Sequence, residues 1–274
     1  MKFLNRFYLL IIENMAITAA QVKELRERTG IGMMECKKAL TESDGDMDLA
    51  IEGLRKKGLA KAAKKADREA FEGGIEITIE DGKAYVVTVA CETDFLAISD
   101  KFKAMLKDLV KFMKENGADI EKAQEFVNSD YALELGENLV IKDFRIVEAP
   151  VVAGYVHSNG KLASVLSAKE GTDAEKLKQV AMHVTAANPE YLSPDDISDE
   201  IVEKEKNLQL EIMKNDPKMG NKPEQVLVKI IEGKMGKFKS EISLLEQGFV
   251  MDPSKKVKDF IGEGNISAFE RITI

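Results

Sequence analysis

The sequence predicts an α+β fold with a duplicated core. Residues 73–94 and 153–173 each contain two strands with alternating or β-branched residues, joined by Asp81-Gly82 in the first segment and by Asn159-Gly160 in the second. Each hairpin leads into an amphipathic helical pattern, and a late apolar strand completes each half. Because a small sheet must bury one face, we expect each half to place its helix over a small antiparallel sheet.

Three short helices are predicted before this core. Thr18 is suited to cap the first helix, and a glycine-containing turn at residues 29–32 ends it. The second helix ends at residues 44–46, Asp-Gly-Asp, and the third begins directly after them. Three helices within about fifty residues share a modest core, and bundles of this kind typically bind partners through exposed loops.

The helices and late strands of the core follow the same order in both halves. The late strands are expected at residues 144–147 and 269–272. The helices are carried by apolar residues at helical spacing, which are Phe102, Met105, Leu106, Leu109, Val110 and Met113 in the first half and Leu177, Val180, Ala181 and Val184 in the second.

Two charged helical segments interrupt the second half at residues 194–239. A polar turn at residues 215–223 separates them, which predicts an inserted antiparallel helical hairpin. Its mixed apolar seam is compatible with self-association and equally with an arm covered only by solvent. The sequence leaves these two interpretations open.

Residues 55–69 form a basic, alanine-rich stretch without large apolar side chains after Leu59. One interpretation is a contact with RNA or phosphate, and the other is a solvated helical linker between domains. We favour the linker, because no aromatic residues alternate with the basic ones to stack on bases.

Composition narrows the class of protein. A net charge of −8 and a pI near 5.2 over 274 residues argue against a nucleic-acid binder, so proteins or small molecules are the expected partners. Two cysteines, Cys36 and Cys91, cannot form a disulfide framework, which favours a reducing cytoplasm. Apolar runs are shorter than the roughly 20 residues that span a bilayer, so no membrane contact is expected. Residues 1–14 are interpreted as an N-terminal extension.

The sequence carries no recognised catalytic motif. His157 and His183 stand in a predicted strand and a predicted helix, without a nucleophile elbow, paired cysteines or a zinc motif nearby. His183 lies within an apolar helical stripe, which favours a hydrogen-bonded core histidine. We therefore expect no catalytic residues, no cofactor and no metal. Cys91 is the one candidate nucleophile, although a lone cysteine in a strand is usually a small apolar core residue.

The stretch CETDFLA, residues 91–97, raises a separate question. Phe95 lies where a β-branched strand ends and a helix begins near Ser99. Position alone favours a side chain that packs into the core, because most large apolar residues at such junctions are buried.

Four segments together resemble one family. Residues 22–65, which include TGIGMMECKKAL, and the ETDF motif at residues 92–95 are similar in sequence and order to elongation factor Ts. AMHVTAANPEYL at residues 181–192 and FVMDPSKKV at residues 249–257 add to the resemblance, which runs from Met15 to the C-terminus. Members of this family are nucleotide exchange factors for the bacterial GTPase elongation factor Tu.

The resemblance implies a domain organisation that agrees with the predicted elements. It places a three-helix domain like the ubiquitin-associated (UBA) domain, with the basic linker, at residues 15–66. The first core subdomain would span residues 67–149 and the second residues 150–196 with 239–274. The insertion at residues 197–238 would be a coiled-coil hairpin, through which the protein could also dimerise.

The resemblance also implies which residues contact the GTPase. In the family the phenylalanine of the ETDF motif is an exposed wedge that enters between GTPase helices, while the aspartate region perturbs the Mg²⁺ site. By this analogy the exchange site is Thr93, Asp94, Phe95 and Leu96. Another helix of the same GTPase domain would contact Arg26, Met33 and Met34, and the second core half would hold another domain of the GTPase.

Some positions depart from the family pattern. Ala90 replaces a frequent asparagine, Leu96 a common valine, and Ile31 a usual alanine beside the first contact surface. The chain ends at Ile274, without the C-terminal helical module of some members. We expect either a lower affinity for the partner or compensation by other surfaces.

Two other function classes remain as alternatives. One is an RNA-binding or ribosome-associated protein that uses residues 55–68, and it predicts strongly salt-dependent binding. The other is a thiol-dependent enzyme that uses Cys91, and it requires an accessible thiol with a depressed pKa.

Overall fold

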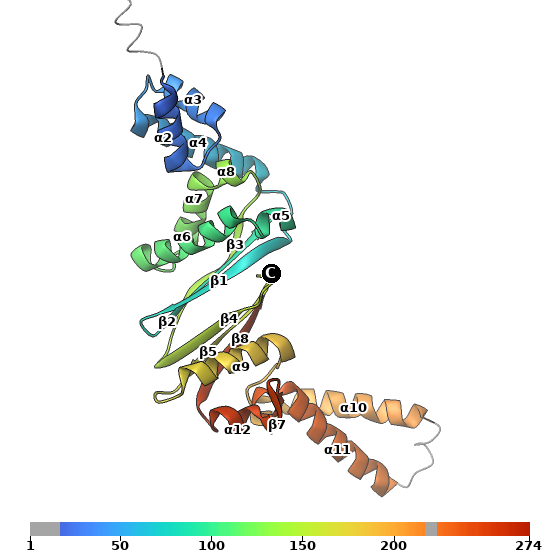
Figure 1. The fold of residues 1–274 in the computed structure, drawn as a ribbon. Coiled ribbons are helices and arrows are strands. Elements are labelled where there is room, and N and C mark those ends of the chain that lie inside the picture. The colour runs from blue at the N-terminus through green and yellow to red at the C-terminus, as the bar shows by residue number, and fades with distance from the viewer. Residues whose placement is uncertain (1–16, 217–223) are drawn as a thin grey trace, which may run out of the picture. The chain divides into compact units, whose positions relative to one another are not determined.

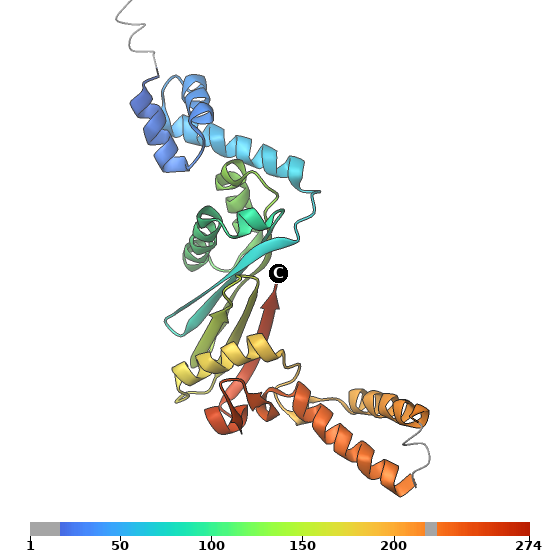
Figure 2. The same cartoon turned by 45° about the vertical axis from the view of Figure 1, so that its right-hand side comes forward.

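The computed structural model describes residues 17–216 and 224–274, and it confirms the predicted α+β class. The chain divides into two compact units. The first contains residues up to 76 together with 86–145 and Ile274, and the second contains residues 77–85 and 146–273. Residues 1–14 and most of the turn expected at 215–223 lie outside the described part of the chain. Figures 1 and 2 show the elements from two sides.

The first unit begins with the three helices α2 (Ala19–Thr29), α3 (Met33–Glu42) and α4 (Met47–Lys65). Thr18 caps α2 as expected, in a capping box with Gln21. The helix ends at Gly30, whose φ of 67° lies in the left-handed region that glycine adopts readily. Asp46 caps α4 by accepting from the N–H groups of Asp48 and Leu49.

Helix α4 packs along α7 (Ile120–Asp130) and α8 (Ala132–Leu135). Leu133 of α8 joins the apolar core of the three helices, and Arg55 pairs with Asp130 at 2.6 Å. Gly58 is buried where α4 approaches the end of α7. The interpretation of residues 55–69 as a solvated linker is therefore wrong for one face of the stretch: it continues α4 through Lys65 and is packed there.

The first sheet has the strand order β1-β2-β3, formed by β1 (Glu72–Glu80), β2 (Lys83–Cys91) and β3 (Val140–Glu148). Asp81 and Gly82 both have positive φ, 51° and 73°, as a type I′ hairpin turn requires. Helix α6 (Asp100–Asn116) buries the predicted apolar stripe, and its Phe102 lies directly against Gly74 of β1. Helices α7 and α8 were not anticipated from the sequence.

The second sheet is antiparallel with the order β4-β5-β8, formed by β4 (Val151–Val156), β5 (Leu162–Ala168) and β8 (Ile266–Thr273). Helix α9 (Ala174–Ala187) packs on β4 and β5, and Figure 1 shows it lying across this sheet. Between α9 and β8 the chain forms further elements, which are η1 (Pro194–Asp196), α10 (Asp199–Asn215), α11 (Glu224–Ile242), η2 (Leu244–Glu246), β6 (Gly248–Phe249), β7 (Asp252–Lys256) and α12 (Val257–Ile261).

Helices α10 and α11 form the predicted inserted pair and lie side by side in both views (Figures 1 and 2). Their shared seam buries Met213, Ile231 and Met235. This is a small apolar contact, and several aliphatic side chains on the pair stay exposed, namely Leu208, Ile212, Val226 and Val228.

His183 connects α9 to the β6–β7 hairpin. Its ring is buried, and its Nδ1 accepts the Val250 N–H at 3.1 Å. The proton therefore resides on Nε2, which donates to Gln247 Oε1 at 2.8 Å. Burial lowers the pKa of His183 below its ordinary value, because a charged ring would be poorly solvated there. The sequence-based expectation of a hydrogen-bonded core histidine is confirmed.

Two glycines of α4 give a matched test of the packing between α4 and α7. A Cβ at Gly58 would lie 2.7 Å from Ser129 O and 2.9 Å from Asn128 O, whereas a Cβ at Gly53 would meet no atom within 4 Å. We expect Gly58→Ala to lower the free energy of unfolding by about 1–3 kcal/mol through overpacking. Gly53→Ala should raise it by up to about 1 kcal/mol through helix propensity. Urea unfolding measures both, and equal effects would contradict the packing.

His183 should make stability depend on pH. Its pKa is lowered in the folded state, so the unfolded chain binds the proton more readily. The stability that the neutral ring contributes is present above the unfolded pKa of about 6.5 and is lost as pH falls below it. Urea unfolding from pH 8 to pH 5 should show this loss in the wild type and not in His183→Gln. The exposed His157, the other histidine, provides the control: His157→Gln should keep the wild-type pH dependence.

Candidate functional site

The exit of β2 turns into a four-residue helix, α5 (Asp94–Ala97). Thr93 is its N-cap, and its hydroxyl oxygen accepts the Leu96 N–H at 3.2 Å. Ile98 ends α5, and the next residue, Ser99, caps α6. Two capped helices in succession therefore fix the path of the chain through the ETDF motif.

Phe95 is 80% exposed, which makes it the most exposed of the large apolar side chains in the described residues. Ala97 is the residue of α5 that faces the core, and Leu96 is half-buried. A single helical turn can direct only one side inward, and here that side carries the small Ala97. The expectation from position alone, that Phe95 packs into the core, is therefore wrong. Ile98 is also exposed and extends the apolar surface beside α5.

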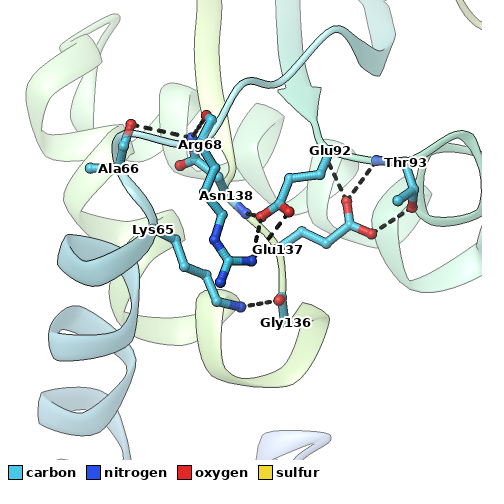
Figure 3. Close-up of polar contacts among 8 residues, drawn as sticks. All are labelled: Lys65, Ala66, Arg68, Glu92, Thr93, Gly136, Glu137 and Asn138. Atoms are coloured by element: carbon cyan, nitrogen blue, oxygen red, sulfur yellow. Dashed lines mark hydrogen bonds and ion pairs between the residues drawn. The ribbon is translucent and has the colours of Figure 1, made fainter.

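The carboxylate of Glu137 holds the start of α5 from a distant part of the chain (Figure 3). Its Oε2 accepts the backbone N–H of Glu92 at 2.8 Å and that of Thr93 at 2.9 Å. Its Oε1 accepts the Thr93 hydroxyl at 2.5 Å. These partners are 44 and 45 residues away in sequence, so no local pattern signals the contact.

Glu92 in turn binds the segment that carries Glu137. Its carboxylate accepts the Asn138 N–H at 2.7 Å and also pairs with the Arg68 guanidinium at 3.3 Å. The Asn138 N–H, with help from Arg68, lowers the pKa of Glu92 below its ordinary value. We call these four residues, Glu92, Thr93, Glu137 and Asn138, the reciprocal clamp, because each glutamate binds the backbone of the segment that carries the other.

The reciprocal clamp is also tied to the end of α4. The Asn138 side chain is buried and donates to Arg68 O at 2.7 Å and to Ala66 O at 3.4 Å. Lys65 donates to Gly136 O, as Figure 3 shows. Sequence reasoning missed Glu137 and Asn138, because their role depends on three chain segments that meet only in the folded unit.

The second predicted contact surface lies on α2 and α3 of the same unit. Arg26, Met33 and Met34 are all exposed, and Met34 is 79% exposed at the start of α3. Ile31, which departs from the family pattern, is buried in the core of the three helices. The departure therefore lies in the interior of the unit and not on the exposed surface of Met33 and Met34.

The thiols do not form a reactive site. Cys91 is fully buried, and its sulfur donates to Thr93 O at 3.3 Å. Burial raises the pKa of the Cys36 thiol, which opposes the thiolate form that a nucleophile needs. The alternative of a thiol-dependent enzyme at Cys91 is excluded by this burial. Among residues 17–216 and 224–274, no group of three or more histidine, cysteine or acidic side chains could hold a metal ion.

A cavity of about 520 Å³ lies between the three N-terminal helices and helices α6 to α8. Four of its charged side chains pair with one another: Arg55 contacts Asp130, and Lys101 contacts Glu134, each at 2.6 Å. The Glu134 carboxylate also occupies the space where Gly30 would carry a Cβ. These ion pairs are typical of an interface between packed helices.

Several cations of the basic stretch have acidic partners. Acidic side chains neutralise several of its cations, including Lys56 by Glu52 and Lys57 by Glu42, in addition to the pairs of Arg55 and Arg68. Paired cations release fewer counterions on binding phosphate, so the RNA-binding alternative loses its main support. Within the described residues, no helix is both long enough and apolar enough to cross a membrane.

Comparisons with known proteins agree on one family. The family model described as "Elongation factor TS" matches residues 92–274. Elongation factor Ts of Vibrio vulnificus (strain YJ016) is 45% identical over 265 residues, which cover 95% of this chain and 92% of the relative. Elongation factor Ts of Haemophilus influenzae (strain PittGG) is 46% identical over 264 residues, which cover 94% and 91%. The chain therefore belongs to the elongation factor Ts family of translation elongation factors.

Proposed function

We propose that this protein is a guanine nucleotide exchange factor for the GTPase elongation factor Tu. It would bind the GDP complex, disturb the Mg²⁺ and nucleotide site, promote GDP release, and then be displaced by GTP. The observation that carries the proposal is the exposed Phe95 on a capped helix that follows directly on Asp94. An apolar ring held in solvent is suited to burial in a partner.

The mechanism is thermodynamic linkage between two ligands of one GTPase. A nucleotide bound at nanomolar affinity requires about 12 kcal/mol for release. A factor that binds the nucleotide-free form better than the filled form weakens nucleotide binding, and nucleotide weakens the factor equally. Burial of Phe95 in the partner would contribute about 1.5–3 kcal/mol. No covalent step, bound cofactor or metal of this chain is needed, so the protein would not act as an enzyme.

The other site residues have separate roles in this proposal. Thr93 and Leu96 would form the edges of the contact around Phe95, and Asp94 would bring a negative charge toward the Mg²⁺ site. Arg26, Met33 and Met34 would bind another helix of the same GTPase domain, since methionine adapts its shape to a protein surface. The second core half would contact another domain of the partner.

The proposal includes the finer organisation inferred from the resemblance. Residues 15–66 would be the UBA-like domain, 67–149 the first core subdomain, and 150–196 with 239–274 the second. Residues 197–238 would be the coiled-coil hairpin. A translation factor of this kind would work in the cytoplasm.

Self-association through α10 and α11 is a further part of the proposal. The exposed Leu208, Ile212 and Val228 give the pair apolar surface beyond its own seam. If they pack between two copies, sedimentation at rising concentration should show a dimer that Leu208→Lys abolishes. A wild-type protein that stays monomeric at about 100 μM, where a contact worth about 5.5 kcal/mol would be half formed, would contradict this.

Phe95→Ala should leave the fold intact and slow GDP release. The ring makes little contact within its own chain, so the melting temperature should stay near that of the wild type. Loss of about 1.5–3 kcal/mol of burial predicts a tenfold to hundredfold lower stimulation of release. The measurement is the release of a fluorescent GDP analogue from elongation factor Tu with and without the protein.

Two variants sharpen this test. Phe71→Ala removes another exposed phenylalanine outside the motif and should not change release. Met34→Ala removes binding surface away from α5, so it should raise the half-saturating concentration more than it lowers the maximal rate. Unchanged release with Phe95→Ala would refute the proposed wedge.

A further inference from the structure

The Phe95 helix is held by a residue outside the motif. Glu137 supplies acceptors for three donors at the start of α5, two backbone N–H groups and one hydroxyl. We propose that Glu137 is a positioning residue for exchange, which acts through Thr93 to fix the direction in which Phe95 points. This inference rests on the proposed function and assigns a role that the ETDF motif does not contain.

Glu137 sets the direction of the Thr93 hydroxyl. A hydroxyl has one proton to donate and lone pairs that accept. Thr93 donates that proton to Glu137 Oε1, which leaves its lone pairs for the Leu96 N–H. Glu137 therefore orients the cap of α5, and a cap left without an oriented hydroxyl would let so short a helix fray.

Glu137 also holds the backbone that precedes α5. β2 ends at Cys91, so Glu92 and Thr93 lie just beyond the strand. Glu137 Oε2 accepts the backbone N–H groups of both residues. Charge-assisted hydrogen bonds of this kind are stronger than neutral ones. Together with the cap, they restrain residues 92–94 from both sides of the turn.

The segment that carries Glu137 is itself anchored. The next residue, Asn138, donates its N–H to Glu92 and its side-chain amide to Arg68 O. Glu137 therefore stands on a segment that is bonded to the motif and to the chain that leaves α4. A carboxylate on a fixed segment can hold a loop, whereas one on a mobile loop would follow it.

The consequence concerns binding and not stability alone. An exposed aromatic on a loose turn would have to be ordered when it enters the partner, and this ordering would reduce the free energy available to weaken nucleotide binding. The reciprocal clamp orders the turn that carries Phe95 before the partner binds. Loss of the clamp should therefore lower the exchange rate through Phe95.

The experiment compares Glu137→Ala, Glu137→Gln and the control Glu125→Ala in the full chain. Glu125 is an exposed acid on α7 of the same unit, so its removal changes the charge equally. Glu137→Gln keeps one oxygen acceptor and should fall between Glu137→Ala and the wild type. If Glu137→Ala does not fold, Glu137→Gln serves as the test variant in its place.

The first readout needs no partner. Hydrogen exchange of the amides at residues 92–96 should accelerate roughly tenfold in Glu137→Ala, because two of these N–H groups lose their acceptor. Glu125→Ala should leave this exchange unchanged. Unaltered exchange in the Glu137 variants would overturn the inference, whatever the effect on GDP release.

The second readout is a double-mutant cycle on GDP release from elongation factor Tu. Glu137→Ala should slow release roughly tenfold in the wild-type background and less than about twofold in Phe95→Ala. Additive effects would show that Glu137 does not act through Phe95. If Phe95→Ala alone has no effect, the proposed function fails at this site, and hydrogen exchange still decides whether Glu137 holds α5.

Discussion

The carboxylate of Glu137 accepts two backbone N–H groups and a hydroxyl at the point where β2 becomes α5. A large apolar side chain in water tends to find a place in its own core, so an exposed Phe95 needs a backbone that cannot fold back. Hydrogen bonds from a second segment provide this restraint. The small Ala97 completes it by taking the one inward position of α5.

In the first unit, apolar contacts determine where the helices lie, and polar contacts determine how α5 is oriented. Burial of α6 against β1, and of α4 against α7 and α8, fixes where the helices lie. Burial is roughly proportional to area and has little directional preference, so it cannot by itself aim a four-residue helix. The reciprocal clamp supplies directional bonds at the junction where β2, the end of α4 and the segment before β3 meet. His183 has the same task in the second unit, where it joins α9 to the β6–β7 hairpin.

An exchange factor of the proposed kind uses binding free energy to weaken another ligand. The free energy needed to order the factor's own contact surface reduces the coupling free energy between the factor and the nucleotide. The exposed Phe95 fits this requirement because the backbone of the capped helix α5 is already ordered, and the exposed Met34 lies on the ten-residue helix α3. In the proposed contact, the flexible methionines would adapt to the partner surface, while the rigid phenylalanine would insert into it.

The sequence alone determined the α+β class, both hairpins, the Asp81-Gly82 turn, the α2 cap and the inserted helical pair, because capping and turn residues act over three or four positions. It also indicated the ETDF motif through family resemblance. The resemblance implied an exposed Phe95, against the expectation from position, and the structure agrees with the resemblance. Only the tertiary structure decided that α4 packs on α7 and α8, and that Glu137 holds Thr93. These outcomes depend on contacts such as that between residues 93 and 137, which are 44 positions apart. No local pattern encodes which distant carboxylate will reach a turn, since that depends on how every intervening element packs.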